Sequence, residues 1–269
     1  MRKNILFTIV LASLLPLSGC SANIDYGEFT LVSDSESAET IFDDYKLKNK
    51  NVADVDECEI VAEMSGSFEN NENETIPVNV VQTVRAGIKE TKYAFDNITK
   101  SDDGTSTSYT RFDETTNKYY TCNALDFSYE ENDVETVVNS NNIEEVNSLN
   151  ENPSKIYTVE DISHSLVVIH ELAFMTYSKD MNIYTSNKGY MKYEDTTEDG
   201  TAENTIVDEN GYIMKSDAWF DDLHMVLKIT YSANFEDINM DDYETRDDEY
   251  LEAFTQSQAK FTSLFNPGF

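Results

Sequence analysis

Residues 58–68 read CEIVAEMSGSF, and this stretch decides the fold. Its even-numbered positions from Ile60 to Phe68 are apolar or small, whereas the odd-numbered positions include two Glu and two Ser. A period of two sends alternate side chains to opposite faces of an extended chain, which is typical of a half-buried β-strand. The same alternation continues over 78–88, after the Asn-rich turn 70–73. We therefore expect a β-sheet to begin here.

Strand-like segments follow in two groups, separated by turn sequences. Asp103-Gly104 and Asn210-Gly211 lie between such segments and are typical of hairpin turns. The first group predicts a five-stranded meander of 59–68, 78–88, 93–99, 107–112 and 119–125. The second group predicts strands at 181–186, 189–194, 202–207, 212–220 and 224–233.

Three segments have helical features instead. Residues 37–48 carry acidic residues early and lysines late, and 249–265 has a partly amphipathic pattern. Residues 158–175 have apolar positions three or four apart after a Thr cap, although the apolar run 166–169 also fits a buried strand. The Asn-rich segment 132–150 predicts a loop or short marginal helices. Together these elements predict an α+β fold with a large antiparallel sheet.

The composition limits the function more than the fold. The chain has 269 residues, with 19 Lys and Arg against 52 Asp and Glu, for a net charge of −33. Hydrophobic residues at 39%, with 12% aromatics, are too many for a disordered chain. Such negative charge repels phosphate backbones and anionic lipids, which argues against nucleic-acid binding and electrostatic membrane docking. A basic partner remains compatible with it.

The N-terminus is typical of a secretory signal. Arg2 and Lys3 precede the apolar run 5–17, which at about 1.5 Å per residue is too short to span a bilayer. The tetrad Leu17-Ser18-Gly19-Cys20 resembles the bacterial lipobox. That resemblance implies removal of the signal peptide 1–19 and lipidation of Cys20, with the acyl chains, palmitate among them, anchoring the protein to the membrane.

We expect residues 20–40 to form the lipidated cysteine and a flexible tether, and 41–269 to form a single α+β domain. Loss of Arg2 and Lys3 with the signal leaves 17 basic against 52 acidic residues, so the mature net charge is −35. The expected location is therefore the cell envelope outside the cytoplasm, with a soluble domain held at the membrane by its lipid.

Beyond the lipobox, the order of elements is similar to that of the LolA/LppX-type lipoprotein fold. The matching features are a helix before the first strand, the strands from Cys58 onward, the hairpin 207–213 and the last strand 227–235. The resemblance implies a large curved antiparallel sheet, a half-barrel, with helices packed on its concave side around an apolar cavity. It further implies binding of lipids or other amphiphiles without catalysis.

No motif indicates an enzyme, a metal or a cofactor. His170-Glu171 opens like a HExxH zinc motif, but Phe174 stands at the second histidine position. His164 and His224 lack metal-ligand spacing, and 257–260 matches SxxK without its companion motifs. The acidic clusters 221–222, 241–242 and 247–249 suit weak Ca²⁺ binding, but solvated loops are the favoured interpretation. A hydrolase would need two carboxylates in one cleft, which the sequence does not place.

Cys58 and Cys122 allow two interpretations. In an extracytoplasmic protein they are able to form a disulfide that closes a loop of about 65 residues. The alternative, which we favour, is two separate buried thiols, because a domain of this size needs no covalent staple.

The aromatic residues supply the candidate ligand site. The chain has 16 Tyr, 14 Phe and one Trp, and a concave face would gather several of them into an apolar lining. The candidate ligand-binding residues are Phe68, Tyr93, Phe95, Tyr109, Tyr120, Trp219 and Tyr231. The alternative is that these side chains simply fill the core under the helices.

The sequence therefore predicts a non-catalytic lipoprotein that binds a lipid, another amphiphile or an envelope partner in an apolar cavity. The alternative prediction is a surface interaction protein that docks a basic partner through its acidic face, without a ligand cavity.

Overall fold

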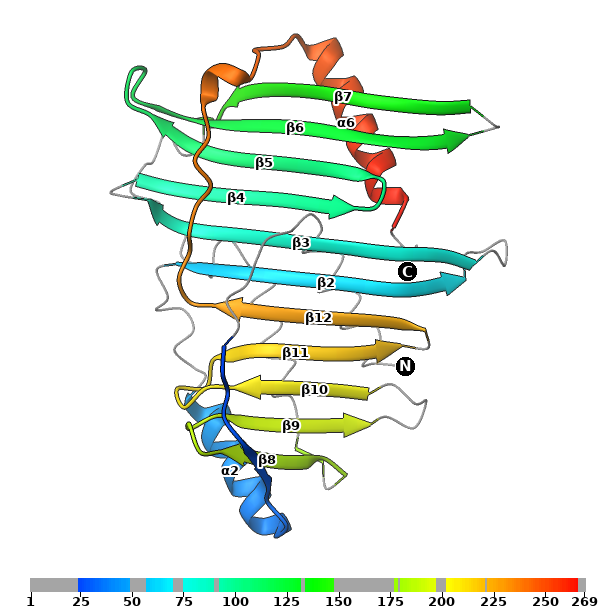
Figure 1. Ribbon diagram of the computed structural model, residues 1–269. Helices are drawn as coiled ribbons and strands as arrows, with labels where there is room; N and C mark the ends of the chain where they lie inside the picture. The colour runs from blue at the N-terminus through cyan, green and yellow to red at the C-terminus, as the bar shows by residue number, and fades with distance from the viewer. Residues whose placement is uncertain are drawn as a thin grey trace.

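The computed structural model describes residues 24–48, 57–69, 75–89, 92–131, 134–147, 177–178, 180–196, 202–220 and 222–265. These residues form one 12-stranded antiparallel sheet with the strand order β1-β8-β9-β10-β11-β12-β2-β3-β4-β5-β6-β7 (Figure 1). The sheet does not close on itself, so β1 and β7 are its two edges.

The strands, in chain order, are β1 Phe29–Leu31, β2 Cys58–Glu69, β3 Thr75–Lys89, β4 Lys92–Ser101, β5 Gly104–Asp113, β6 Lys118–Glu131, β7 Val134–Glu145, β8 Asn182–Ser186, β9 Met191–Thr196, β10 Ala202–Val207, β11 Ile213–Phe220 and β12 Leu223–Thr230. The helices of the described residues are α2 Ser35–Lys48, the short 3₁₀ helix η2 Met240–Asp242 and α6 Asp248–Ser263.

Two meanders build this sheet. Strands β2 to β7 follow one another across one half, and β8 to β12 follow one another across the other half. The halves join where the last strand, β12, pairs antiparallel with β2, from Leu223↔Gly66 to Thr230↔Glu59. The final strand of the chain therefore lies in the middle of the sheet, and the C-terminal residues must leave from there.

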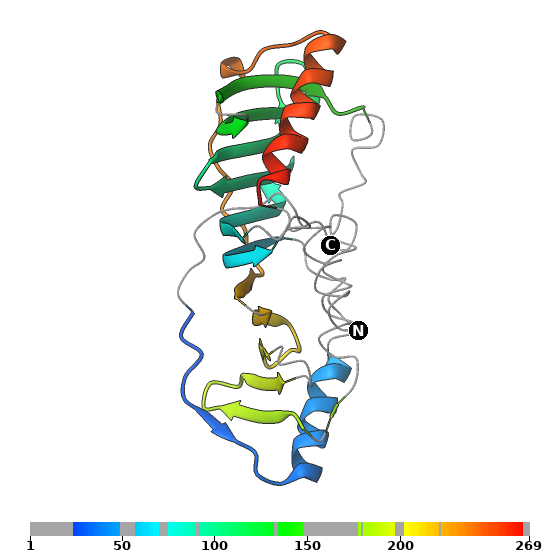
Figure 2. The ribbon, with the colours of Figure 1, turned by 90° about the vertical axis from the view of Figure 1, so that its right-hand side faces the viewer.

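The two α-helices, α2 and α6, pack on the same face of the sheet, which we call the helix face. Ile60, Ala62 and Met64 share one side of β2 because they are two residues apart. The first two belong to the core cluster that includes Phe42 of α2, and Met64 belongs to the cluster that includes Phe254 of α6. Figure 2 shows α2 and α6 on the same side of the sheet, over opposite ends of it.

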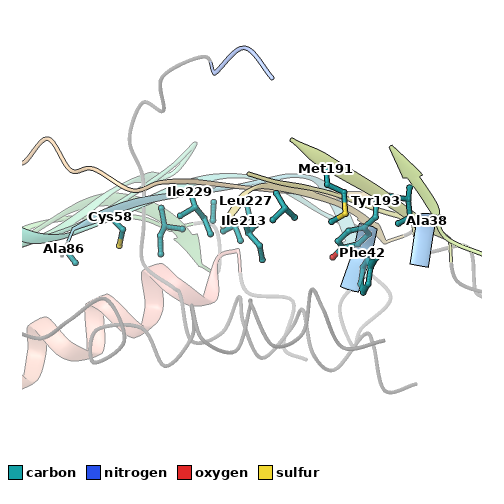
Figure 3. Packing of buried hydrophobic residues seen from close by; sticks show 13 residues of the cluster. Ala38, Phe42, Cys58, Ala86, Met191, Tyr193, Ile213, Leu227 and Ile229 are labelled. Carbon is teal, nitrogen blue, oxygen red and sulfur yellow. The ribbon is translucent and has the colours of Figure 1, made fainter. Parts of the chain in front are cut away.

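Apolar side chains from both halves of the sheet supply these cores. Figure 3 shows the cluster at the α2 end, with its side chains pointing from the strands toward the helix side. Its buried members are Ala38, Phe42, Cys58, Ile60, Ala62, Ala86, Ile183, Met191, Tyr193, Val207, Ile213, Leu227 and Ile229. The cluster at the α6 end consists of Met64, Val78, Val80, Leu125, Phe127, Leu223, Met225, Phe254, Phe261 and Phe265.

Residues 231–247, which we call the strap, run from the end of β12 to the start of α6 across the other face. We call this face the strap face. In Figure 1 the strap passes in front of β2 to β6, and in Figure 2 it lies on the side of the sheet away from α6. The chain thus crosses one face, turns at the β7 edge and returns as α6 on the opposite face.

The α+β class and the large antiparallel sheet are confirmed. Each of the ten predicted strands corresponds to an observed strand, and the helices expected at 37–48 and 249–265 are α2 and α6. The predicted helix 158–175, the signal peptide 1–19 and Cys20 lie outside the described residues.

Two expectations were wrong. Most of the segment 132–150, expected to be a loop or marginal helices, is the 12-residue strand β7, so the first meander has six strands. The expected tether 20–40 overlaps ordered structure, because β1 pairs with β8 from Phe29↔Ser186 to Leu31↔Tyr184 and α2 begins at Ser35. The main-chain bonds of β1 attach this part of the chain to the sheet.

Phe42 tests the contribution of α2 to the fold. Its side chain is 0% exposed, so Phe42→Ala is expected to lower the free energy of unfolding by about 3–5 kcal/mol through lost burial and a cavity. Leu47 on the same helix is 61% exposed, and Leu47→Ala is the control, with an expected change within about 0.5 kcal/mol. Urea unfolding measures both, and equal effects would contradict the packing described for α2.

Candidate interaction surfaces

A cluster of charged side chains lies on the strap face under the strap, with four members buried in the sheet and the fifth, Glu236, half-exposed on the strap. We call it the Asp96 cluster, and it consists of Glu59, Arg85, Asp96, Arg111 and Glu236. The Asp96 carboxylate is 0% exposed and pairs with two guanidinium groups, at 3.3 Å from Arg85 Nη1 and 2.5 Å from Arg111 Nη2. Strands β2, β3, β4 and β5 supply four of the five side chains, and the strap supplies the fifth.

Glu236 joins the strap to this cluster through both its side chain and its main chain. Its Oε1 lies 3.0 Å from Arg85 Nη1, and its main-chain N–H donates to Asp96 Oδ2 at 2.9 Å. Arg111 Nη2 donates to the Glu236 carbonyl oxygen at 2.7 Å. The strap is therefore held at one residue by three hydrogen bonds to charged groups, each of the stronger kind.

The carboxylates of the cluster stabilise the charged form of the buried Arg85 guanidinium. Burial alone would lower the pKa of the Arg85 guanidinium, but hydrogen bonds with the carboxylates of Glu59, Glu236 and Asp96 raise it above its ordinary value. Glu59 Oε2 accepts from Arg85 Nε at 2.5 Å. Because each buried charge has opposite charges as partners, removal of one carboxylate would leave a guanidinium buried and undercompensated.

A second anchor holds the far end of the strap to the sheet edge. Ile143 of β7 donates its N–H to the Glu244 carbonyl at 3.0 Å, and Asn141 donates its N–H to the Tyr250 hydroxyl at 3.2 Å. Arg246 Nε donates to the Asn141 carbonyl at 3.3 Å, and its guanidinium lies over the Tyr250 ring. Residues 244–250 thus occupy hydrogen-bonding positions along one half of β7.

Four of the seven candidate ligand-binding aromatics belong to the packed core. Phe68 packs against the core cluster at the α6 end, and Tyr93 is buried against Tyr119. Phe95 packs at the border of two clusters. Tyr231 packs against the cluster at the α2 end and donates its hydroxyl proton to the Ile213 carbonyl at 2.9 Å.

The other three candidates lie on the strap face. Register pairing places Tyr109 of β5 opposite Asp96 and Cys122, on the side of the Asp96 cluster. Tyr120 of β6 pairs with Arg111 on the same side. Trp219 of β11 pairs with His224, and their rings stack at 4.6 Å between centroids. The seven aromatics are therefore divided between two faces and do not form one lining.

Amide and hydroxyl side chains occupy much of the helix face on β3 to β7. Gln82, Thr99 and Asn142 are 2%, 0% and 0% exposed, yet within the described ranges Gln82 Nε2, Thr99 Oγ1 and Asn142 Nδ2 have no hydrogen-bond partner. The residues that share this band are Gln82, Asn97, Thr99, Ser106, Ser108, Thr110, Thr121, Asn123, Ser140 and Asn142. A band of this chemistry is unfavourable for an acyl chain.

Both cysteines of the domain are free thiols. Cys58 and Cys122 are buried, in agreement with the favoured interpretation of separate thiols. Cys58 belongs to the helix-face core, whereas the side chain of Cys122 points to the strap face. Burial raises the pKa of the Cys58 thiol to about 12 and that of Cys122 to about 11, so neither has the activated thiolate of a catalytic cysteine.

The acidic clusters 241–242 and 247–249 lie at the N-termini of helices. The side chain of Asn239 accepts from Asp241 N at the start of η2, and that of Asp247 accepts from Tyr250 N at the start of α6. Within the part of the chain that the structure describes, no group of three or more His, Cys, Asp or Glu side chains is arranged to hold a metal ion.

Comparison with known proteins gives no relative: no protein-family model and no curated protein matches the sequence.

The Asp96 cluster and the strap contacts are the features that sequence analysis missed. The only local signal is a single charge inside each of three predicted strands that are otherwise uncharged, at Arg85, Asp96 and Arg111. Charged residues are rarely buried unless paired, so these three positions were candidates for one shared site. Glu236, 140 residues beyond Asp96, has no such signal.

Asp96→Asn tests whether the Asp96 cluster holds the strap to the sheet. Loss of this buried carboxylate is expected to cost about 3–5 kcal/mol of unfolding free energy, because two buried guanidiniums lose their common partner. The control is Glu145→Gln, whose partner Lys118 lies 2.7 Å away at the surface, with an expected cost of at most about 1 kcal/mol. Urea unfolding with limited proteolysis of the strap distinguishes them, and an undisturbed strap in Asp96→Asn would contradict the anchoring role.

Proposed function

We propose that this chain is a lipid-anchored, non-catalytic binding protein of the bacterial cell envelope, which docks a basic protein partner through its acidic surface. The lipobox-like tetrad ending at Cys20 and the signal-like residues before it support the location outside the cytoplasm. No helix among the described residues is long and apolar enough to cross a bilayer.

The distribution of polar side chains is the observation that favours docking of a protein partner over transport of an amphiphile. The helix face carries packed cores at its two ends and the amide and hydroxyl band over β3 to β7. An amphiphile carrier needs a broad apolar wall, and this band interrupts the wall over β3 to β7, leaving the apolar row continuous only on β2 and β12. The strong negative charge instead favours association with a basic surface, by raising the association rate and by excluding acidic partners.

A lipid or amphiphile ligand is the second candidate. It is favoured by the position of α2 and α6 on one face of an open sheet, which is the arrangement the half-barrel resemblance implies. In this proposal the sheet curves around α2 and α6, and Phe68, Tyr93 and Phe95 border the bound chain.

The proposed lipid anchor is tested by Cys20→Ser in a cell that processes lipoproteins. The parent protein is expected to enter the detergent phase on Triton X-114 partition, and the variant to remain in the aqueous phase because it lacks acyl chains. Cys58→Ser is the control and keeps the parent's partition. Mass spectrometry of the N-terminal peptide identifies the lipid, and an unmodified Cys20 would contradict the anchor.

The two binding functions are separated by cross-linking in cells, followed by native mass spectrometry of the purified protein. Docking predicts one recurrent basic protein cross-linked at stoichiometric yield, and its loss when the salt concentration is raised before cross-linking. Carriage predicts a co-purifying mass of several hundred daltons that persists in high salt. A protein recovered alone at low salt, without lipid, would contradict both.

A further inference from the structure

The outer edge of β7 divides into two halves that differ in their hydrogen bonding. In the regular β6–β7 register, Ile143 and Asn141 direct their main-chain groups away from β6, and these groups bond the strap and α6. The same alternation directs the main-chain groups of Glu135, Val137 and Asn139 away from β6. Among the described residues these three have no hydrogen-bond partner on that side.

Side-chain exposure divides β7 at the same place. Glu135, Val137 and Asn139 are exposed, whereas Asn141 and Ile143 are half-buried beneath the strap. Five large hydrophobic side chains are exposed in the described part of the chain, and two of them are Val134 and Val137, at 61% and 68%. Exposed valines beside unpaired main-chain groups are the features that allow another strand to pair with a sheet edge.

The edge carries little of the protection that sheet edges usually have. Residues 134–139, sequence VETVVN, contain no Pro, Lys or Arg, and β7 pairs with β6 without a bulge. The segment is about 20 Å long, which suits an added strand of about six residues. The strap shows that the main chain of this edge bonds a neighbouring segment, because Ile143 N–H donates to the Glu244 carbonyl in the same strand.

The charge of the β6–β7 hairpin determines which kind of strand is able to pair with the open half of β7. The β6–β7 hairpin, residues 118–145, contains seven acidic residues and one Lys. A second copy paired through β7 would bring two such acidic hairpins together, and like charges across a strand pair are destabilising. A strand rich in Lys or Arg would instead face Glu135 on the edge strand and the neighbouring Glu130 and Glu131 on β6.

We propose that residues 134–139 of β7 form a strand-addition site for an extended basic segment of a protein partner. This inference rests on the proposed function as a docking protein and names the surface and the binding mode. The partner's main chain pairs with Glu135, Val137 and Asn139, Val134 and Val137 contact its apolar side chains, and the hairpin's carboxylates attract its cations.

The test uses the mature chain with Cys20→Ser, so that no detergent is needed, and three synthetic eight-residue peptides. In the first, lysine alternates with valine. The second has glutamate in place of lysine. The third has the sequence of the first with every amide N-methylated, which removes the main-chain donors and keeps the charge. Titration calorimetry in low salt is expected to show the highest affinity for the first peptide. The affinities of the other two are expected to be at least about tenfold lower.

Two variants localise the binding. Val137→Pro removes an outward N–H without removing a bond to β6, and is expected to weaken the lysine peptide at least about tenfold. Val137→Thr keeps the main-chain donor and the β-branched side chain, and is expected to stay within about threefold of the parent. Amide hydrogen exchange on the parent gives a reading that needs no variant: residues 135, 137 and 139 become protected when the peptide binds.

Equal binding of the N-methylated peptide, or unchanged binding to Val137→Pro, would overturn strand addition and leave docking by charge intact. Failure of the lysine peptide to bind the parent would also overturn the site. A concentration-dependent dimer of the parent that Val137→Pro abolishes would assign the edge to a second copy and overturn the basic strand. Failure of the proposed function itself is seen separately, as the absence of a salt-sensitive partner in cells.

Discussion

The pairing of the buried Asp96 carboxylate with Arg85 and Arg111 is the interaction on which the rest of the molecule depends. The last strand, β12, lies in the centre of the sheet, so the chain must cross six strands to bring α6 to its place. Glu236 binds the Asp96 cluster midway through that crossing. Buried ion pairs often add little net stability, but they specify one arrangement, because each misplaced segment would leave a charge unpaired. Here the specified arrangement is the path of the strap.

The path of the strap determines which part of the sheet edge is closed. From the cluster it reaches the far half of β7, where Glu244 and Arg246 bond Ile143 and Asn141. The chain then turns to the helix face and continues as α6. The other half of β7, around Val137, is not reached by the strap before the chain turns. Among the described residues, one half of this edge strand is therefore bonded by its own chain and the other half is not, and the negative charge around it disfavours acidic chains.

Much of the fold followed from period-two alternation, and the exceptions have a physical reason. Strand β2 alternates clearly because one of its faces packs under α2 and α6. Strand β7 was missed because its helix-face positions include Ser140 and Asn142, so no apolar alternation distinguishes it from a loop. The aromatic candidates were expected on one face, but Tyr109 and Tyr120 lie on the strap face. Which face each occupies depends on the pairing with the neighbouring strand, which local sequence does not specify. The contact of Glu236 with the Asp96 cluster depends on pairing over 140 residues, which local patterns do not contain.

Amide hydrogen exchange of the free protein, resolved along β7, tests this account most directly. Slow exchange is expected for the main-chain N–H of Asn141 and Ile143, which donate to the Tyr250 hydroxyl and the Glu244 carbonyl. Fast exchange is expected for Glu135, Val137 and Asn139 in the same strand, and in Asp96→Asn the protection of Asn141 and Ile143 is expected to fall toward that of the open half. Uniform protection along the outward-facing amides of β7, unaffected by Asp96→Asn, would contradict the account.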